Sequence, residues 1–432
     1  MKSNNKYMKW FYTAAVAVTA LLMVACEDEP DKYEIAGGSP TIKYVRMPDP
    51  LVADSLLTGA YMDNMICLVG NNLRSICELF FNDQKAILNT SYMTDNTILV
   101  NVPGNIPSKV TDKIYMVTSS NDTISYDFKV LVPGPQVNSM SCEFAKPGSE
   151  VTLYGDYFID DPNVPLTISM AGNVAVTNIT KVTKTAVSFI LPQDAPEGYI
   201  NVKSIYGNGR SKFRYNDKRN ILFDWDGSHG GIAIANGWRK GIVKNDNNSL
   251  DGGYLYFGGA EIVGEIGGTW AEDQFCFNYW PDVANGSPEL SSLTAFDEMI
   301  TKYGVEGLQM KFEVMIPSSN AWKSAALQMM FTSNADVTMA TAGNGYYSSS
   351  TLPRGLWLPW KSTGSYDTEG KWTTVSFKLS DFNKTHEGGA SAAAFSKENL
   401  KGLTFFVWNG GVAGENCNPV ICIDNIRVVP IE

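Results

Sequence analysis

The chain has 432 residues, 44% hydrophobic and 18% charged, a composition that excludes intrinsic disorder. Its 34 basic and 45 acidic side chains give a net charge of −11, which argues against a nucleic-acid-binding surface and against charge-driven adsorption to anionic lipid. The length exceeds what one hydrophobic core fills, so two to four domains are expected. Of the ten tryptophans, Trp10 lies near the N-terminus and the other nine lie between Trp225 and Trp408. We therefore expect two types of domain, with ligand binding in the second.

Residues 1–25 have the pattern of an export signal. Lysines in the first nine residues precede sixteen uncharged residues, 10–25, too short a run to span a bilayer comfortably. The run ends in Leu-Met-Val-Ala-Cys, which resembles a bacterial lipoprotein cleavage site and makes Cys26 the expected site of lipidation. The Glu-Asp-Glu that follows resembles the signal that sends lipoproteins to the outer surface in Bacteroidetes. We expect residues 26–38 to be a tether and the protein to be lipid-anchored in the outer membrane, facing the extracellular side; an ordinary signal peptide is the alternative.

The sequence from Ser39 onward predicts an all-β protein. Short β-rich runs alternate with Gly, Pro, Asn and Asp, and the best helical candidate, 293–303, is long enough for only about three turns. Six cysteines follow the lipidation site, but no CxxC pair or His partner indicates a metal, and no disulfide pairing is assigned. Cys67 and Cys422 lie in apolar runs, where a free buried thiol is the simplest expectation.

An internal repeat follows the tether. Residues 66–73 (ICLVGNNL) match 151–158 (VTLYGDYF), and 94–103 match 184–192. In both copies an alternating strand reaches a Gly and then a polar turn, which we attribute to a positive φ at the glycine. Each copy spans about 85–95 residues, the size of one immunoglobulin-like sandwich. These residues resemble the TIG (IPT) family of immunoglobulin-like domains.

The repeat sets the first two domain boundaries. We place one TIG-like domain at 39–133 and the second at 134–217, joined at Pro133-Gly134-Pro135, where proline stiffens the chain. Neither copy contains a tryptophan or a cluster of catalytic residue types. We therefore expect both domains to be spacers.

The remaining domain, 218–432, has clear strand patterns. Apolar residues recur at every second position from Phe312 to Ile316, from Leu327 to Phe331 and from Val375 to Leu379, which predicts antiparallel sheets packed face to face with one wet side. In 403–408, Phe406 and Trp408 point away from the apolar set. The fold class predicted for the whole chain is therefore two immunoglobulin-like sandwiches followed by a larger jelly-roll-like β-sandwich.

The termini of this domain carry a further resemblance. The opening 221–226 (ILFDWD), the segment 372–377 (WTTVSF) and the closing 421–428 (ICIDNIRV) resemble jelly-roll carbohydrate-binding modules. With the lipid signal and the TIG-like repeats, the chain resembles the type B surface glycan-binding proteins of Bacteroidetes polysaccharide-utilisation loci. That resemblance implies a non-catalytic protein that binds xyloglucan or a related β-glucan such as mixed-linkage glucan. The implied partners are polysaccharide, a TonB-dependent transporter with its SusD-like protein, and surface glycanases.

Aromatic platforms would supply such binding. A flat indole covers the apolar face of a pyranose ring, and each stack contributes roughly 0.5–1.5 kcal/mol by analogy with aromatic pairs. We expect the ligand-binding residues on loops, where side chains reach the surface; they are Trp322, Trp357, Trp360, Trp280 and Tyr347, with Tyr346 as a neighbour. Hydrogen bonds to the sugar rim are expected from Arg354, Lys323, Asn320 or Gln328.

The other tryptophans are divided. Trp225, Trp372 and Trp408 are expected in the framework, although Trp408 could line the wet face, and Trp238 and Trp270 are undecided.

No cofactor or catalytic residue is expected. A structural calcium held by Asp224, Asp226 and Asp424 is considered, because hard oxygen ligands suit that ion. A glycanase needs two placed carboxylates, and no pair stands out among the 45 acidic residues. With only two histidines, little remains for a His-based triad or a zinc site. A surface adhesin that binds a protein partner is the main alternative, and an outer-surface glycanase is the third.

Overall fold

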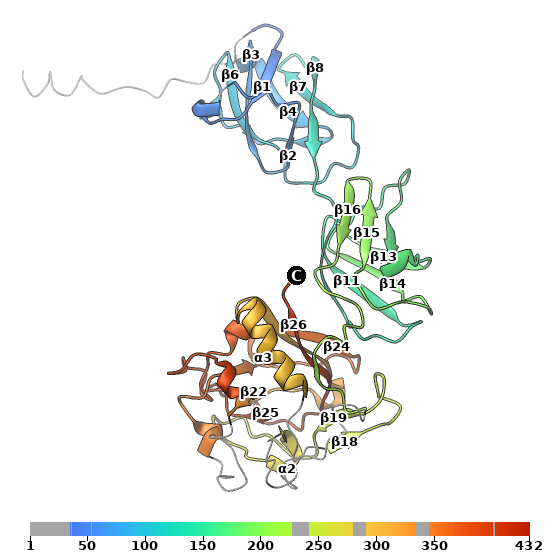
Figure 1. The fold of residues 1–432 in the computed structure, drawn as a ribbon. Coiled ribbons are helices and arrows are strands. Elements are labelled where there is room, and N and C mark those ends of the chain that lie inside the picture. The colour runs from blue at the N-terminus through green and yellow to red at the C-terminus, as the bar shows by residue number, and fades with distance from the viewer. Residues whose placement is uncertain are drawn as a thin grey trace, which may run out of the picture. The chain divides into compact units, whose positions relative to one another are not determined.

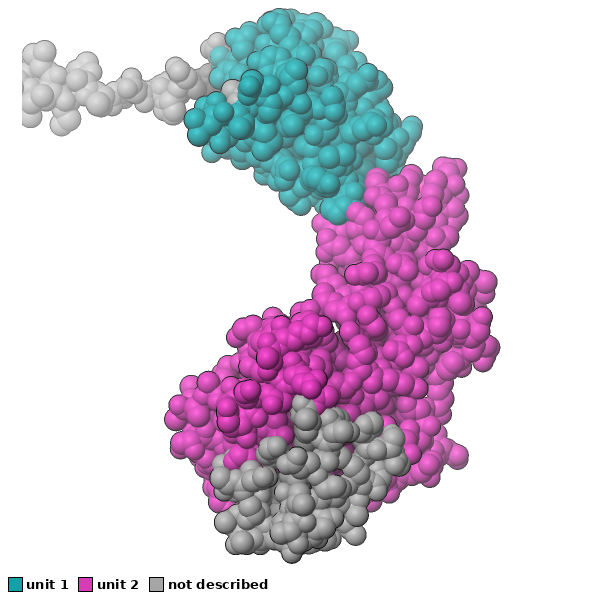
Figure 2. Space-filling view, viewed as in Figure 1, with its two compact units in different colours: residues 1–133 teal, residues 134–432 magenta. Residues whose placement is uncertain are grey.

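The computed structural model describes residues 35, 37–52, 54–226, 242–279, 291–333, 345–400 and 402–432, with the backbone alone for 291–294. The chain forms two compact units, residues 1–133 and 134–432, shown in different colours in Figure 2. The division falls at Pro133-Gly134, where the repeat places a boundary. Strands dominate both units, so the all-β prediction is confirmed (Figure 1). The predicted lipidation site Cys26 lies outside the described residues.

Unit 1 is one β-sandwich. Its sheets have the orders β1-β3-β6 and β5-β4-β7-β8, with a short parallel pair β2-β9. The strands are β1 (Thr41–Arg46), β2 (Gly59–Tyr61), β3 (Met65–Asn71), β4 (Ile76–Phe81), β5 (Gln84–Lys85), β6 (Thr97–Asn101), β7 (Lys113–Thr118), β8 (Thr123–Asp127) and β9 (Lys129–Leu131). Alternate residues of β3, β6 and β7, among them Ile66, Val100 and Ile114, meet in a single core.

Unit 2 begins with a second sandwich of the same kind. Its sheets have the orders β10-β11-β14-β13 and β12-β15-β16, around a core of its own. The strands are β10 (Gln136–Met140), β11 (Glu150–Asp156), β12 (Thr167–Ser169), β13 (Ile179–Val182), β14 (Ala186–Ile190), β15 (Asn201–Ser204) and β16 (Gly207–Arg210).

The repeated glycines have a different role from the predicted one. Neither Gly70 nor Gly155 has a positive φ; the left-handed residues are Asn72 and Tyr157, two positions later. A Cβ on Gly70 would lie 1.8 Å from the carbonyl oxygen of Thr41, and one on Gly155 would lie 1.8 Å from that of Gln136. The repeat therefore keeps glycine because the neighbouring strand crosses at van der Waals distance from its Cα.

A larger sandwich completes unit 2. One sheet has the order β18-β19-β26-β21-β24, with β17 also paired to β26, and the other has the order β20-β25-β22-β23. The strands are β17 (Ile221–Phe223), β18 (Ile242–Lys244), β19 (Tyr254–Phe257), β20 (Cys276–Tyr279), β21 (Leu308–Met315), β22 (Ala326–Thr332), β23 (Arg354–Trp357), β24 (Thr373–Lys378), β25 (Gly402–Trp408) and β26 (Ile421–Pro430). The helices are α2 (Glu272–Phe275) and α3 (Ser291–Tyr303), and α3 contains the predicted helical segment.

The period-two pattern identifies the core of this sandwich correctly. Phe312, Met329 and Phe405 lie in one core between the two sheets, and Val375 and Phe377 of the third predicted set are half-buried against it.

The expectation of one wet side is confirmed for β24, where Ser376 and Lys378 are exposed. It is wrong for β21 and β22, where the outward residues Glu313 and Gln328 are each 0% exposed. Other parts of the protein cover the polar sides of these two strands. The alternating pattern of apolar and polar residues is the same whether water or protein covers the polar side.

Buried charges join the two sandwiches of unit 2. Glu143, from the loop after β10, accepts hydrogen bonds from Lys311 (2.5 Å) and Arg427 (2.9 Å), and Arg427 also donates to Glu313 (2.8 Å). All four residues are at most 4% exposed. Thr374 of β24 connects the same two glutamates, because its hydroxyl donates to the Glu313 carboxylate and accepts from the Glu143 backbone N–H. Two cations face two anions, so this four-charge network is neutral and firmly ties the sandwiches together.

Two further properties concern the described residues. The cysteines after residue 26 are all free, and Cys67 and Cys422 are buried, as predicted. No helix within the described ranges has the length and apolar character needed to cross a membrane.

Candidate functional site

Three of the predicted platform residues are buried. Trp322 is 0% exposed, Trp360 is 3% exposed and Tyr347 is 0% exposed, so the prediction that they are displayed for ligand is wrong. Trp357 is half-buried. Trp280 lies outside the described residues.

The burial of Trp322 and Trp360 has a local cause. Each indole N–H is bonded to backbone beside the start of β22: Trp322 donates to the Ser324 carbonyl (2.6 Å) and Trp360 to the Ala325 carbonyl (2.7 Å). Turn residues folded back in this way cap the end of the sandwich, and both indoles join its core. Loop position therefore did not bring surface exposure.

Trp357 belongs partly to the same cluster. It ends β23, which is an edge strand, the position in a sheet where nearby Pro and Gly residues are tolerated. Its ring packs edge-on against Trp322 (5.5 Å between centroids), Phe312 (5.8 Å) and Tyr366 (5.6 Å). Of the predicted platforms in the described residues, it is the one that retains accessible surface.

The expected rim residues are also inside. Arg354 and Gln328 are each 0% exposed, so neither can line an open rim as predicted. The Arg354 guanidinium donates to the Gln328 side chain (2.6 Å) and to the Tyr347 carbonyl (2.5 Å). Lys323 and Asn320 keep partial exposure.

The structure gathers another set of aromatic rings on the outer face of the sheet β20-β25-β22-β23. Trp270 lies at its centre, with ring centroids 4.9 Å from Trp408, 4.9 Å from Phe406 and 5.1 Å from Tyr347. His386 lies parallel to Trp408 at 5.5 Å. We call these five residues the aromatic face. Phe406 and Tyr347 are buried, whereas the other three keep partial exposure.

Polar groups under the rings fix their positions. The Asn278 amide donates to the Tyr347 hydroxyl (2.8 Å) and accepts from Thr404 (2.7 Å). Gln328 donates to the Trp408 carbonyl (2.6 Å), and the Trp270 indole donates to the Glu272 carboxylate. Buried polar groups satisfied in this way hold the rings without adjustment on binding, which keeps the entropic cost of binding low.

The electrostatics of this face favour a neutral ligand. Burial lowers the pKa of Arg354 to about 10, so it stays charged at pH 7, and backbone carbonyls solvate its guanidinium. Burial also lowers the pKa of His386, which is therefore neutral at pH 7. Burial raises the pKa of Tyr347, so its hydroxyl keeps its proton. The half-exposed rings carry no charge; the charged groups beside them are the Glu272 carboxylate bonded to Trp270 and the Glu387 carboxylate 3.6 Å from His386, which disfavour an anionic ligand.

The sequence pattern predicts part of the aromatic face. The alternation in 403–408 placed Phe406 and Trp408 away from the core, and the alternative in which Trp408 lines the wet face is closer to the structure than the framework assignment. The sequence leaves the role of Trp270 undecided. Nothing in the sequence links His386 to Trp408.

The described residues offer no metal centre. Within the described ranges, no group of three or more His, Cys, Asp or Glu side chains is arranged to hold a metal ion. Asp224, Asp226 and Asp424 therefore do not form the calcium site considered from the sequence.

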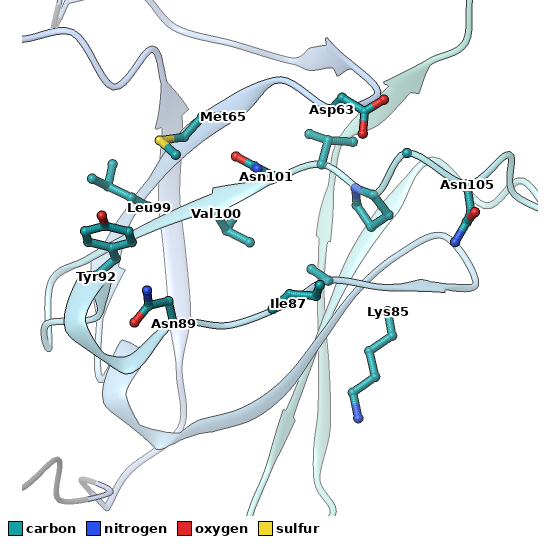
Figure 3. Close-up of a pocket in the computed structure, with 14 residues that line it drawn as sticks. Asp63, Met65, Lys85, Ile87, Asn89, Tyr92, Leu99, Val100, Asn101 and Asn105 are labelled. Atoms are coloured by element: carbon teal, nitrogen blue, oxygen red, sulfur yellow. The ribbon is translucent and has the colours of Figure 1, made fainter.

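Unit 1 also contains a hollow, although it was expected to be a spacer with little to bind. A pocket of about 420 Å³ lies beside the edge strand β6, with Ile87 (91% exposed) and Tyr92 (51% exposed) among its lining residues. Figure 3 shows Met65 and Leu99 on the side of Tyr92, and Asn101 close to Val100. Its lining is mainly apolar.

The fold and the aromatic face define a class, the carbohydrate-binding β-sandwich. The family model described as the surface glycan-binding protein B xyloglucan binding domain matches residues 215–430. The solved structure of surface glycan-binding protein PbSGBP-B from Prevotella bryantii is 37% identical, with a TM-score of 0.77, over 92% of this chain and 100% of that one. The chain belongs to the surface glycan-binding protein B family, and the resemblance read from the sequence is confirmed.

Two further relatives are more distant. SGBP-B from a complex xyloglucan utilization locus in Bacteroides uniformis is 16% identical, with a TM-score of 0.44, over 91% of this chain and 100% of that one. An IPT/TIG domain-containing protein from Bacteroides ovatus is 26% identical over 244 residues, which cover 51% of this chain and 48% of that protein. The chain thus spans about half the length of this curated relative. The Prevotella bryantii relative is a surface glycan-binding protein by name, and the name of the Bacteroides ovatus relative supports the TIG-like character of the repeats.

Proposed function

We propose that the protein is a non-catalytic surface lipoprotein that binds a neutral β-glucan, with xyloglucan favoured over mixed-linkage glucan, on the aromatic face. The family supports polysaccharide binding by the C-terminal domain. The observation that carries the location is the gathering of Trp270, Trp408 and His386, all half-exposed and uncharged, above a fixed polar layer.

The stacking surface is tested by Trp270→Ala and Trp408→Ala, alone and together. Two lost stacks cost about 1–3 kcal/mol, so the double variant should bind xyloglucan roughly 5- to 150-fold more weakly. Affinity electrophoresis against xyloglucan, mixed-linkage glucan, xylan and mannan measures this, with thermal unfolding to show that each variant is folded.

Trp357→Ala is the matched control, because it removes a half-exposed indole from the other cluster. It should migrate as wild type does on every gel. If Trp357→Ala alone abolished retardation, the site would lie around Trp357 and Tyr366. Wild type that migrates freely through every polymer would defeat the proposed function itself.

The absence of catalysis is part of the proposal. Incubation of the protein with the same polymers should release no reducing sugar, and release above that of a heat-denatured sample would make it a glycanase. This assay is independent of the binding variants.

The anchor and the partners also remain proposals. We propose that lipid on Cys26 holds the protein in the outer membrane, facing outward, where it passes polysaccharide to a TonB-dependent transporter with its SusD-like protein and to surface glycanases. Retention raises the local concentration of substrate for these partners. Cys26→Ser should abolish labelling by a radioactive fatty acid. Antibody staining of the protein at the cell surface should also be lost, and unchanged labelling would contradict the assignment.

A further inference from the structure

A second hollow lies within unit 2, between the TIG-like sandwich and the larger sandwich. It is a groove of about 710 Å³, within the range of about 300–1,000 Å³ typical of ligand sites. One wall is the loop before β11 and β11 itself, and the other consists of the loops 246–250 and 368–373. We call it the inter-sandwich groove. It is separate from the aromatic face, because Trp372 packs on the sheet that contains β19, not on the sheet that contains β25.

The walls of the groove are fixed to each other. Lys146 donates to the Ser249 carbonyl (2.9 Å), and the Thr374 backbone N–H donates to the Ser141 carbonyl (3.0 Å). The four-charge network lies nearby, through Glu143, which follows Ser141 by two residues. A preformed groove binds its ligand without paying for closure of the two domains.

The lining has the chemistry of a carbohydrate site. Trp372 is held by its indole N–H, which donates to the Asn248 carbonyl (2.7 Å), and by an edge-on contact with Tyr254. Across the groove Tyr154 is 46% exposed. Residues with hydroxyl or amide side chains also line the groove; they are Ser141, Ser149, Thr152, Asn247, Asn248 and Ser249.

The charges of the lining balance. Lys146 and Lys371 are matched by Glu150 and Glu369, so the groove has no net charge to attract an ionic ligand. Two aromatic side chains with many hydroxyls and amides, at zero net charge, suit an uncharged polyhydroxyl chain.

We infer that the inter-sandwich groove is a second binding site for a neutral glycan, which takes a short segment of the polysaccharide through Trp372 and Tyr154. This inference rests on the proposed function for the class of ligand, but it concerns a different surface. Two sites on one rigid unit would bind a long polymer more tightly than either site binds an oligosaccharide.

Tyr154→Ala with Asn247→Ala tests the groove, since both side chains are exposed and their loss leaves the sandwich cores intact. Calorimetric titration of the full chain with a xyloglucan oligosaccharide should give two sites for wild type and one for this double variant, and retardation by the polymer should weaken at least threefold. Tyr61→Ala, which removes a tyrosine 53% exposed in unit 1, is the matched control and should titrate as wild type does.

Hydrogen exchange provides the second measurement. Saturating oligosaccharide should slow exchange in 246–250 and 368–373 of the Trp270→Ala, Trp408→Ala variant, in which only the groove remains. One site in wild type, with an unchanged titration for the groove variant and no protection in these loops, overturns the inference and leaves the proposed function standing. Wild type that binds no oligosaccharide and no polymer overturns both.

Discussion

Asp424 is a carboxyl group in an environment that opposes ionisation. Its side chain is 0% exposed in the middle of β26, and Glu313 lies opposite on β21. Burial raises the pKa of Asp424 to about 10, and the charge of Asp251 adds to the rise. The group therefore holds its proton in the folded protein at pH 7, whereas in the unfolded chain its pKa is about 3.9 and it is ionised.

This difference makes stability depend on pH. The folded state binds a proton that the unfolded state releases, so this contribution is complete below about pH 4 and is lost as pH rises toward about pH 10. Asp424→Asn resembles the protonated form and does not titrate. We expect it to raise the free energy of unfolding by at least about 1 kcal/mol at pH 8 and to flatten the pH profile.

Urea unfolding at pH 5 and pH 8 measures both effects. The exposed Asp381→Asn serves as control and should keep the wild-type slope. If Asp424→Asn were less stable than wild type at pH 8 and kept its slope, Asp424 would be ionised in the folded state.

At the scale of the element, the paired glycines of the repeat show how one backbone contact is used twice. Gly155 is crossed by β10 and Gly70 by β1, each at a carbonyl oxygen. Gly155→Ala should force β10 and β11 apart and destabilise unit 2 by roughly 1–3 kcal/mol or more, as overpacking does. Gly70→Ala should do the same to unit 1. Calorimetry of the full chain should therefore show a different transition lowered in each variant.

Gly345→Ala provides the comparison, because nothing lies within 4 Å of the Cβ that it would add and its φ is not left-handed. It should leave both transitions in place. If the Gly155→Ala protein were as stable as wild type, the two strands could separate at this point without cost. The close strand crossing would then not explain why both copies carry a glycine here.

The same scale shows what the sequence could predict. Period-two patterns locate strands and their core sides well, because inward residues such as Phe312 and Phe405 must be apolar whatever lies beyond. They cannot tell what covers the other side, as Glu313 and Gln328 show. The platform prediction is wrong for Trp322 and Trp360 for a similar reason. Whether a loop tryptophan turns outward depends on a backbone acceptor, which for Trp360 is the Ala325 carbonyl, far from it in sequence.

On the scale of the whole molecule, the four-charge network sets how the second TIG-like sandwich presents the glycan-binding one. Glu143 is its only member from the TIG-like sandwich, and it faces Lys311 and Arg427. A buried ion pair adds little net stability over apolar contact, but removal of one partner leaves an uncompensated charge and costs about 3–5 kcal/mol. The network therefore fixes the orientation of the two sandwiches more than it stabilises either.

Glu143→Gln tests this coupling, because it keeps the shape of the side chain and leaves two cations with Glu313 alone. We expect the transition of unit 2 to fall by at least about 5 °C in calorimetry, and small-angle scattering to show a broader range of orientations. Glu150→Gln, an exposed change in the same sandwich, should alter neither. Adding Lys311→Met to Glu143→Gln removes one cation with the lost anion, so it should recover most of the loss. A Glu143→Gln protein with wild-type stability and scattering would mean that the apolar contacts alone hold the two sandwiches together.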